Sequence, residues 1–352
     1  MLLYIHIPFC DSKCHYCSFN SYVDKFHLKQ AYMDALLTQL KYELDRFDAK
    51  KNSIETLFIG GGTPSSVSAE LYEPIFRLIA PYMQEDAEIT SEANPNSATK
   101  EWLEGMYALG VNRISFGVQS FDANKLKILN RAHSQKQAIN AVENAAKAGF
   151  EHISLDLIYA VLGDTKELLQ HDLDQAFSLP IDHLSAYALT IEENTPFAQK
   201  PQMSKEHLDQ TKWLFEEIAR RGFSQYEISN FGRYKSRHNL GYWHYKDYIG
   251  AGAGAVGKKG DIRLYPQTSI ESYIQSPTEL DSEELSQEDM KFEQIFLGLR
   301  SEVGVDEQLL DESERKRAEI LTTEGKLTYE KEHYYNVDFL LADEIALFLG
   351  HL

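Results

Sequence analysis

The chain has 352 residues, of which 43% are hydrophobic and 25% are charged, and its formal net charge is −19. This composition is typical of a folded globular protein, and the negative charge argues against nucleic acid as the main partner. No apolar run approaches the ~18 residues of a membrane span, and the first residues lack the basic start of a signal or transit peptide. Three cysteines suit a reducing compartment, so we expect a cytoplasmic protein.

Short apolar runs alternate with amphipathic stretches along most of the chain. Strands are expected at residues 2–6, 56–60, 87–93, 112–118, 152–158 and 183–189. The apolar spacing predicts helices at residues 28–47, 68–79, 122–129, 134–148, 166–177 and 205–221. This alternation predicts an α/β fold with a parallel sheet and right-handed crossovers. Six such units predict a partial (β/α)6 barrel, open where a full barrel would close.

All the cysteines of the chain lie in one short loop after the first expected strand. Cys10, Cys14 and Cys17 have the spacing Cys-x3-Cys-x2-Cys, which lets a loop point three thiolates inward. An iron–sulfur cubane is usually held by four cysteine thiolates, so three would leave one iron open to another ligand. Two alternatives remain on the residues alone: a zinc site completed by His6 or His15, and three structural thiols.

Polar and glycine-rich loops follow the expected strands, at the barrel end where parallel barrels carry their chemistry. Gly60-Gly-Gly-Thr63-Pro64 is either a tight turn or a backbone that approaches a ligand closely. Glu92 ends the third strand, where a carboxylate is either solvated or paired with donors. Asp156, in the fifth strand, is either a residue that contacts a ligand or a buried acid satisfied by backbone donors.

The residues around the cysteines resemble a known family, and this resemblance favours the iron–sulfur cluster over the zinc site and the structural thiols. Tyr-Ile-His-Ile-Pro-Phe-Cys-x3-Cys-x-Tyr-Cys, residues 4–17, resembles the opening of radical S-adenosylmethionine proteins of the oxygen-independent coproporphyrinogen dehydrogenase group. The resemblance implies a [4Fe-4S] cluster on Cys10, Cys14 and Cys17, with S-adenosylmethionine chelating the open iron. It also implies the same three-quarter barrel.

The resemblance assigns further residues to cofactor binding, on the matching Gly-Gly-Thr, Glu-x-Asn-Pro and Gly-Val-Gln-Ser-Phe stretches. These residues are Tyr4, Tyr16, Gly61, Gly62, Thr63, Glu92, Gln119, Arg131 and Asp156. The planar fork of an arginine suits the carboxylate of a bound amino acid. One stretch departs from the group, because Ala160-Val-Leu-Gly-Asp-Thr165 replaces the usual Gly-Leu-Pro-Gly-Gln-Thr. We therefore expect a different backbone path for the turn after the fifth strand.

A second informative segment follows the expected barrel. His238-Asn-x-x-Tyr242-Trp243 offers a neutral imidazole as an axial iron ligand and two flat aromatic surfaces for a macrocycle. The alternative is a packed surface histidine. The spacing resembles the motif of the heme chaperone branch of the group, which implies that His238 binds heme.

The next stretch, residues 250–257, contains a formal Gly-x-Gly-x-x-Gly match. We interpret it as a false match, because no barrel strand is expected before it and the dinucleotide fingerprint needs one. The resemblance instead places Val256 near a second cofactor molecule.

The domain organisation is predicted as a barrel at residues 1–230, a heme-motif segment with an acidic linker at 231–285, and a small, mainly helical C-terminal domain at 286–352. The acidic residues 278–289 are expected to be a solvated linker. A helix is expected at 290–300, and a helix–wing–helix arrangement at 327–349.

Two functions follow from the resemblance: an enzyme that oxidatively decarboxylates coproporphyrinogen, and a heme chaperone that retains the cluster and S-adenosylmethionine. Three features favour the chaperone, without coproporphyrinogen dehydrogenase activity. Phe19 stands where the dehydrogenase has a further cysteine, only residues 1–9 precede Cys10, and the His238 motif is present. The implied partners are heme and a heme-acceptor protein, with respiratory, membrane-associated proteins as candidates.

Overall fold

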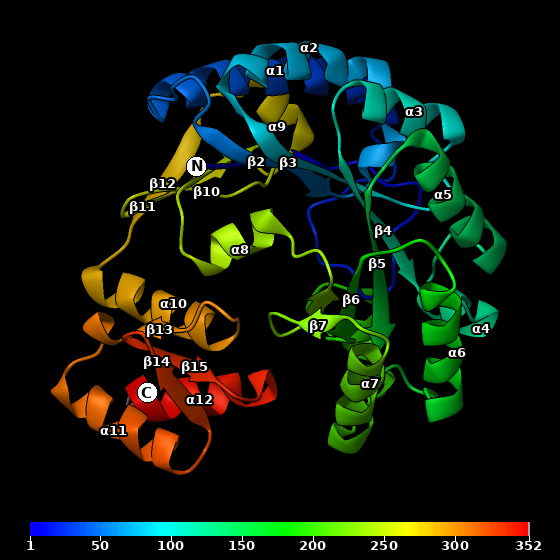
Figure 1. Cartoon of the computed structure of the whole chain (residues 1–352). Coiled ribbons are helices and arrows are strands. Elements are labelled where there is room, and N and C mark those ends of the chain that lie inside the picture. The colour runs from blue at the N-terminus through cyan, green and yellow to red at the C-terminus, as the bar shows by residue number, and fades with distance from the viewer. Residues whose placement is uncertain (351–352) are drawn as a thin grey trace.

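The computed structural model describes residues 1–350 and contains a curved 12-stranded sheet (Figure 1). Its six central strands are β1 (Leu2–Ile7), β2 (Ile54–Gly61), β3 (Met83–Ala93), β4 (Arg113–Gln119), β5 (His152–Tyr159) and β6 (His183–Ala188). Neighbouring strands among these six are all parallel. The predicted α/β class with six parallel strands is confirmed.

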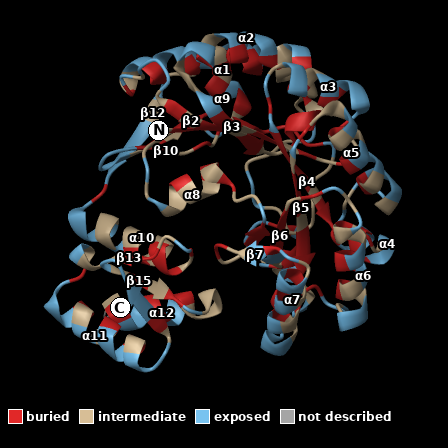
Figure 2. Cartoon of the chain, viewed as in Figure 1, coloured by how far each residue is buried: buried red, intermediate tan, exposed pale blue. Residues whose placement is uncertain are grey.

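Helices cover the outer side of this sheet and bury one face each (Figures 1 and 2). They are α1 (Lys29–Arg46), α2 (Ala69–Ile79), α3 (Lys100–Ala108), α4 (Ala123–Ile128), α5 (Gln135–Ala148), α6 (Lys166–Phe177) and α7 (Leu208–Arg220). The sequence reading missed α3. Its signals are present, because Thr99 caps the helix by accepting from the Trp102 N–H, and Trp102, Leu103 and Met106 are buried.

The two faces of the central strands differ in polarity. Successive side chains of a strand point to opposite faces, and the apolar ones, such as Ile114 and Phe116 of β4, are fully buried in the main hydrophobic core. The alternate positions carry buried polar groups, listed by strand as Thr56, Glu88, Thr90, Arg113, Ser115, Ser154, His183 and Ser185. The interior of the curve is therefore a polar, hydrogen-bonded layer.

Short strands extend the sheet at both edges. β8 (Asn230–Gly232) pairs antiparallel with β6 and with β7 (Ser224–Gln225). On the other edge β9 (Tyr248–Ala251) pairs parallel with β1 and leads to β10 (Gly257–Lys259), β11 (Ile262–Pro266) and β12 (Leu280–Glu284), with α9 (Ile270–Gln275) between the last two.

Two expectations are corrected by these edge strands. A strand of the sheet, β9, does precede the glycine-rich stretch in the sequence and includes its first residues, Gly250 and Ala251. This strand pairs parallel with β1. The acidic segment expected as a linker contains β12, which pairs antiparallel with β11. Its side chains are mostly exposed, as expected for a solvated segment.

Helix α8 (Arg237–Trp243) lies inside the curve of the sheet (Figure 1). The Glu88 carboxylate on β3 accepts the N–H groups of Arg237 at 2.9 Å and His238 at 3.0 Å. A carboxylate at a helix N-terminus is stabilising, because the free N–H groups there carry partial positive charge. The central strands therefore fix the position of α8.

The C-terminal region has its own core. Its helices are α10 (Gln287–Leu299), α11 (Glu312–Thr323) and α12 (Ala342–Gly350), and its three-stranded sheet has the order β13 (Val305–Asp306), β15 (His333–Asn336), β14 (Leu327–Glu330). The sequence reading missed α11 and β13. The domain boundaries stay a prediction. No helix within residues 1–350 is both long and apolar enough to cross a membrane.

A buried charge cluster joins α4 to the turn after β5. The Lys125 ammonium lies 2.9 Å from Asp164 and 3.8 Å from Asp172, and all three side chains are at most 3% exposed. Two buried carboxylates without their cation are costly, so we expect Lys125→Met to lower the free energy of unfolding by about 3–5 kcal/mol.

Urea denaturation measures this difference. The matched control is Lys147→Met, which breaks the exposed pair with Glu143 and should cost less than about 1 kcal/mol. Equal costs for the two variants would contradict the assignment of a stabilising buried cluster.

Candidate functional site

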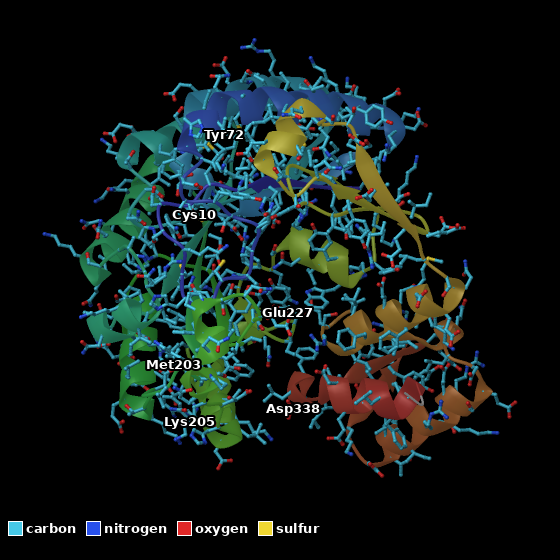
Figure 3. All side chains as sticks on the ribbon, turned by 180° about the vertical axis from the view of Figure 1, so that it is seen from behind. Cys10, Tyr72, Met203, Lys205, Glu227 and Asp338 are labelled. Atoms are coloured by element: carbon cyan, nitrogen blue, oxygen red, sulfur yellow. The ribbon has the colours of Figure 1, made fainter. Side chains whose placement is uncertain are left out.

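The three cysteines lie in the loop between β1 and α1, and Cys10 is labelled in Figure 3. All three are free thiols; Cys10 is buried and the other two are partly exposed. Cys10 Sγ is 3.4 Å from Thr63 Oγ1, and Arg131 Nη1 donates to Cys14 Sγ at 3.3 Å. Burial raises the pKa of the Cys10 thiol, and the hydrogen bond with Thr63 opposes that rise. The thiolate is the form that binds iron.

The loop fits a cluster better than a single ion. Within residues 1–350, no three Cys, His, Asp or Glu side chains converge on one metal position. A cubane places each thiolate on a different iron, so its ligands need no common point. Of the two histidines considered as zinc ligands, His6 has partners on both ring nitrogens, because Nε2 bonds the Asn20 carbonyl at 2.8 Å and Nδ1 bonds the Tyr4 hydroxyl at 3.0 Å. His15 Nδ1 bonds the Ile128 carbonyl at 2.9 Å.

The glycine-rich loop after β2 packs against the cysteine loop. A Cβ on Gly62 would lie 2.9 Å from the Ile7 and Phe9 carbonyl oxygens and 3.1 Å from Cys10 Sγ. Gly61 has φ +108°, and a Cβ there would lie 2.5 Å from the His6 ring. Only glycine fits either position. The backbone of this loop therefore lies directly against the cysteine loop and the His6 ring.

Glu92 and Asp156 bring two carboxyl groups to the same interior. Glu92 accepts the Gly61 N–H at 3.1 Å, and Asp156 accepts from Ser115 at 3.4 Å. Burial raises the pKa of Glu92 to about 8, and the charge of Asp156 adds to the shift. Burial also raises the pKa of Asp156. A carboxyl with a raised pKa gains most from a bound cation, such as the amino or sulfonium group of S-adenosylmethionine.

Arg131 connects the loops after four strands. Its Nη2 donates to Asn94 Oδ1 and to the Gly117 carbonyl, both at 2.6 Å, and Asn94 Nδ2 donates to Thr63 Oγ1 at 2.9 Å. Asn94 was not among the residues predicted for this site. Its position directly before Pro95, in the stretch that carries Glu92, was the available signal.

Gln119 and Tyr16 lie beside Arg131. Gln119 ends β4 with φ +68°, and its amide nitrogen lies 3.0 Å from the place of a Cβ on Gly117, where Arg131 Nη2 lies at 3.2 Å. Burial raises the pKa of Tyr16. The charge of Arg131 opposes that rise, and the charge of Cys14 adds to it. The structure therefore brings together the predicted residues of the first four strand ends.

A cavity of about 800 Å³ opens from this pocket toward α10. Tyr4, Gly61 and Glu92 line its inner end, and Val256 lines it from the loop between β9 and β10. The rest of the lining includes the aromatic side chains Phe19, Tyr242, Tyr245, Tyr248, Phe292 and Phe296, the basic side chains Lys246, Lys258 and Arg263, and the carboxylate of Glu293. The volume is within the range of pockets that enclose a drug-sized ligand.

His238 does not line this cavity. Its side chain is 1% exposed, with Nδ1 at 2.7 Å from Thr56 Oγ1 and Nε2 at 3.0 Å from the Tyr242 hydroxyl. Burial lowers the pKa of His238 to about 3, and the positive charge of Arg113 contributes. Both ring nitrogens therefore have partners, and the described geometry offers no free lone pair for axial ligation. The heme-ligand role of His238 stays a prediction, without support from this arrangement.

The comparisons with known proteins show the superfamily and the fold. The model of the radical SAM superfamily matches residues 4–176. In the solved structures, the coproporphyrinogen III oxidase HemN of Escherichia coli, a radical SAM enzyme, has a TM-score of 0.83 at 22% identity, covering 100% of this chain and 90% of HemN. That likeness shows the fold.

Curated relatives narrow the family. The heme chaperone HemW of Bacillus subtilis is 37% identical over 321 residues, covering 86% of this chain and 84% of that protein. HemW of Mycobacterium tuberculosis strain H37Rv is 34% identical over 345 residues, covering 93% and 88%. HemW of Escherichia coli is 40% identical over 267 residues, covering 73% and 69%. The chain belongs to the HemW family of radical SAM proteins.

Membership of the radical SAM superfamily implies a [4Fe-4S] cluster and S-adenosylmethionine. When bound, this pair supplies one-electron chemistry. In this chain Cys10, Cys14 and Cys17 would hold the cluster, and Arg131 would donate to one of its ligand sulfurs. The Gly61–Gly62 backbone, Glu92 and Asn94 would position the cofactor beside the open iron.

We expect each of Cys10→Ala, Cys14→Ala and Cys17→Ala to abolish the cluster, because the chain has no other thiol. Anaerobically reconstituted wild-type protein should contain about four irons per chain, measured by iron analysis and by its iron–sulfur absorbance. His15→Ala is the matched control and should keep the cluster. Zinc in place of iron in the wild type would contradict the assignment.

We expect Gly61→Ala to lose S-adenosylmethionine binding while the iron content stays unchanged. The added methyl group would meet the His6 ring and would sit at a φ that side chains rarely adopt, so the loop must move. Equilibrium dialysis against the cofactor measures the loss. Gly163→Ala, also at positive φ but with open space around its Cβ, controls for backbone strain alone and should bind normally.

Proposed function

We propose that the protein is a cytoplasmic heme chaperone. It binds heme, retains the cluster and S-adenosylmethionine, and passes the heme to an acceptor protein. The relatives named above as heme chaperones support this function at 34–40% identity.

The observation that carries the proposal is the position of the cavity. Its inner end shares Tyr4, Gly61 and Glu92 with the candidate cofactor pocket, and its outer wall has Phe292 and Phe296 of α10. Flat aromatic side chains pack well against a macrocycle, because they bury large apolar area in defined geometries. One ligand in this cavity would therefore contact both the cofactor pocket and the C-terminal region.

The charges of the cavity suit an anionic macrocycle. Lys246, Lys258 and Arg263 line it. Each already has a carboxylate partner, at 2.6 Å in Glu55, 3.3 Å in Asp247 and 2.6 Å in Glu293 respectively, so a ligand anion would share or replace these partners. Heme carries two propionates, which are well matched by lysine and arginine side chains. The overall charge of −19 would repel a free anion, so binding depends on these local cations.

The second candidate is coproporphyrinogen dehydrogenase. The fold of HemN supports it, because the two chains share their architecture. A porphyrinogen would fit the same aromatic cavity. Phe19, which the resemblance places at a further cysteine of the dehydrogenase, lines that cavity and is 65% exposed. The assay must therefore test both activities on one preparation.

We expect wild-type protein with a reconstituted cluster to bind about one heme per chain and to leave coproporphyrinogen unchanged. Absorbance titration measures binding, and product analysis measures decarboxylation. Phe292→Glu, which puts a charge in the aromatic wall, should weaken heme binding by about tenfold or more, equivalent to about 1.4 kcal/mol.

Phe348→Glu is the matched control, because Phe348 is an exposed phenylalanine of the same C-terminal region that does not line the cavity. It should bind heme as the wild type does. Transfer of heme from the wild type to a heme-free acceptor protein completes the test. Decarboxylation of coproporphyrinogen by the wild type would overturn the chaperone in favour of the enzyme.

A further inference from the structure

The His238 motif presents a tyrosine, not its histidine, to the cavity. Tyr242 follows His238 by one helical turn of α8 and lines the cavity, whereas His238 lies behind it. The two rings pack edge to face with centroids 4.8 Å apart, and Phe58 stacks on the other side of the imidazole at 5.1 Å. Of these two side chains, only Tyr242 is therefore in contact with the cavity.

The hydrogen bonds of His238 allow the Tyr242 oxygen to be a phenol or a phenolate. The partner of Nδ1 is the Thr56 hydroxyl, which can donate or accept. Nε2 can therefore accept from a phenol, with the ring proton on Nδ1, or donate to a phenolate, with the ring proton on Nε2. The imidazole stays neutral in both states, as its burial requires.

A second tyrosine–histidine pair on the same wall lacks this freedom. Tyr4 bonds His6 Nδ1 at 3.0 Å, and His6 Nε2 bonds the Asn20 carbonyl, which only accepts. The proton of a neutral His6 must therefore sit on Nε2, so that Nδ1 accepts from the Tyr4 phenol. Of the two pairs, only Tyr242–His238 can stabilise a phenolate through a neutral ring.

We propose that Tyr242 is the protein ligand of ferric heme iron and that His238 is a positioning residue, whose Nε2–H donates to the coordinated phenolate. This inference rests on the proposed heme-binding function. Tyrosine is an established axial ligand of heme iron. An Fe–O bond forms, the phenolic proton passes to water in the cavity, and the iron remains ferric, so no electron is transferred.

The wall near this ligand accommodates the rest of the macrocycle. Tyr248 packs edge to face on Tyr242 at 4.8 Å, and Lys258 lies over the Tyr245 ring at 4.0 Å. Lys258 is only 4% exposed, and its partners are a carbonyl at 3.4 Å and Asp247 at 3.3 Å. A propionate would give this buried ammonium a closer anionic partner.

The test is ferric heme binding by full-length protein with its cluster reconstituted, read by absorbance titration and resonance Raman spectroscopy. The wild type should show tyrosine phenolate vibrations that shift when the protein is made with ring-deuterated tyrosine. Tyr242→Phe should lose these vibrations and weaken heme binding by about tenfold or more, about 1.4 kcal/mol. Circular dichroism and iron content verify that the variant is folded with its cluster.

Two tyrosine variants are matched controls. Tyr245→Phe and Tyr4→Phe each remove a cavity hydroxyl with a known partner, Glu293 and His6 respectively, and both should keep the phenolate vibrations.

Thr56→Val removes the hydroxyl partner of His238 without touching the cavity wall. It should keep Tyr242 as ligand but shift the phenolate vibration, which a merely structural role of His238 would leave unmoved.

The outcomes separate this inference from the proposed function. A wild-type heme complex without phenolate vibrations, with a spectrum that Tyr242→Phe leaves unchanged, overturns Tyr242 as ligand while heme binding stands. A histidine-ligated spectrum that is lost in His238→Ala and kept in Tyr242→Phe assigns the iron to His238 instead. No heme binding by the wild type overturns both the inference and the chaperone function.

Discussion

The polar interior of the barrel depends on the buried guanidinium of Arg113. This side chain is 2% exposed, and its one hydrogen bond within residues 1–350 is a long contact of 3.5 Å to Thr90. Burial raises the pKa of Glu92 and Asp156, and the Arg113 charge opposes that rise. Burial lowers the pKa of His183 and His238, and the same charge adds to that effect. Burial is thus the main reason that the histidines stay neutral, and the Arg113 charge reinforces it while it lowers the cost of the buried carboxyl groups.

The cofactor side and the proposed heme side are built on the same strands. Thr56 and Phe58 of β2 contact His238, and the same strand ends in Gly61 of the cofactor pocket. Glu88 of β3 holds the start of α8, and Glu92 lies four residues further along that strand. The two sites are thus connected through stiff, hydrogen-bonded strands rather than through a flexible linker. Heme bound against Tyr242 would be held at a fixed distance from the cofactor.

The sequence predicted best what is local. The glycine-rich turn, the six parallel strands and most of their helices depend on neighbours within a few residues, and the structure has these elements together with α3, which was not predicted. The environment of His238 could not be predicted in this way, because Thr56 and Phe58, which contact its ring, come from β2, far away in the sequence. β12 was missed because its side chains are mostly exposed, so the strand shows no alternation of apolar and polar residues. β9 has four residues and owes its place to pairing with β1, a contact that spans most of the chain.

The turn after β5 is the stretch in which the sequence departs from the pattern that the resemblance implies. Ala160 has φ +61° and Gly163 has φ +98°, and the backbone between them bonds the segment at Met203 and Lys205 (Figure 3). Asp164 closes the turn by accepting the Val161 N–H at 3.1 Å.

Asp164 also accepts from Lys125 of α4, and Arg131 follows the C-terminal end of that helix, with its N–H bonded to the Leu126 carbonyl. The aspartate that replaces the usual glutamine thus forms a buried ion pair with the helix that leads into Arg131. The Lys125–Asp164 pair thus fixes α4 against the turn after β5, and α4 in turn bonds the backbone of Arg131, the arginine beside Cys14.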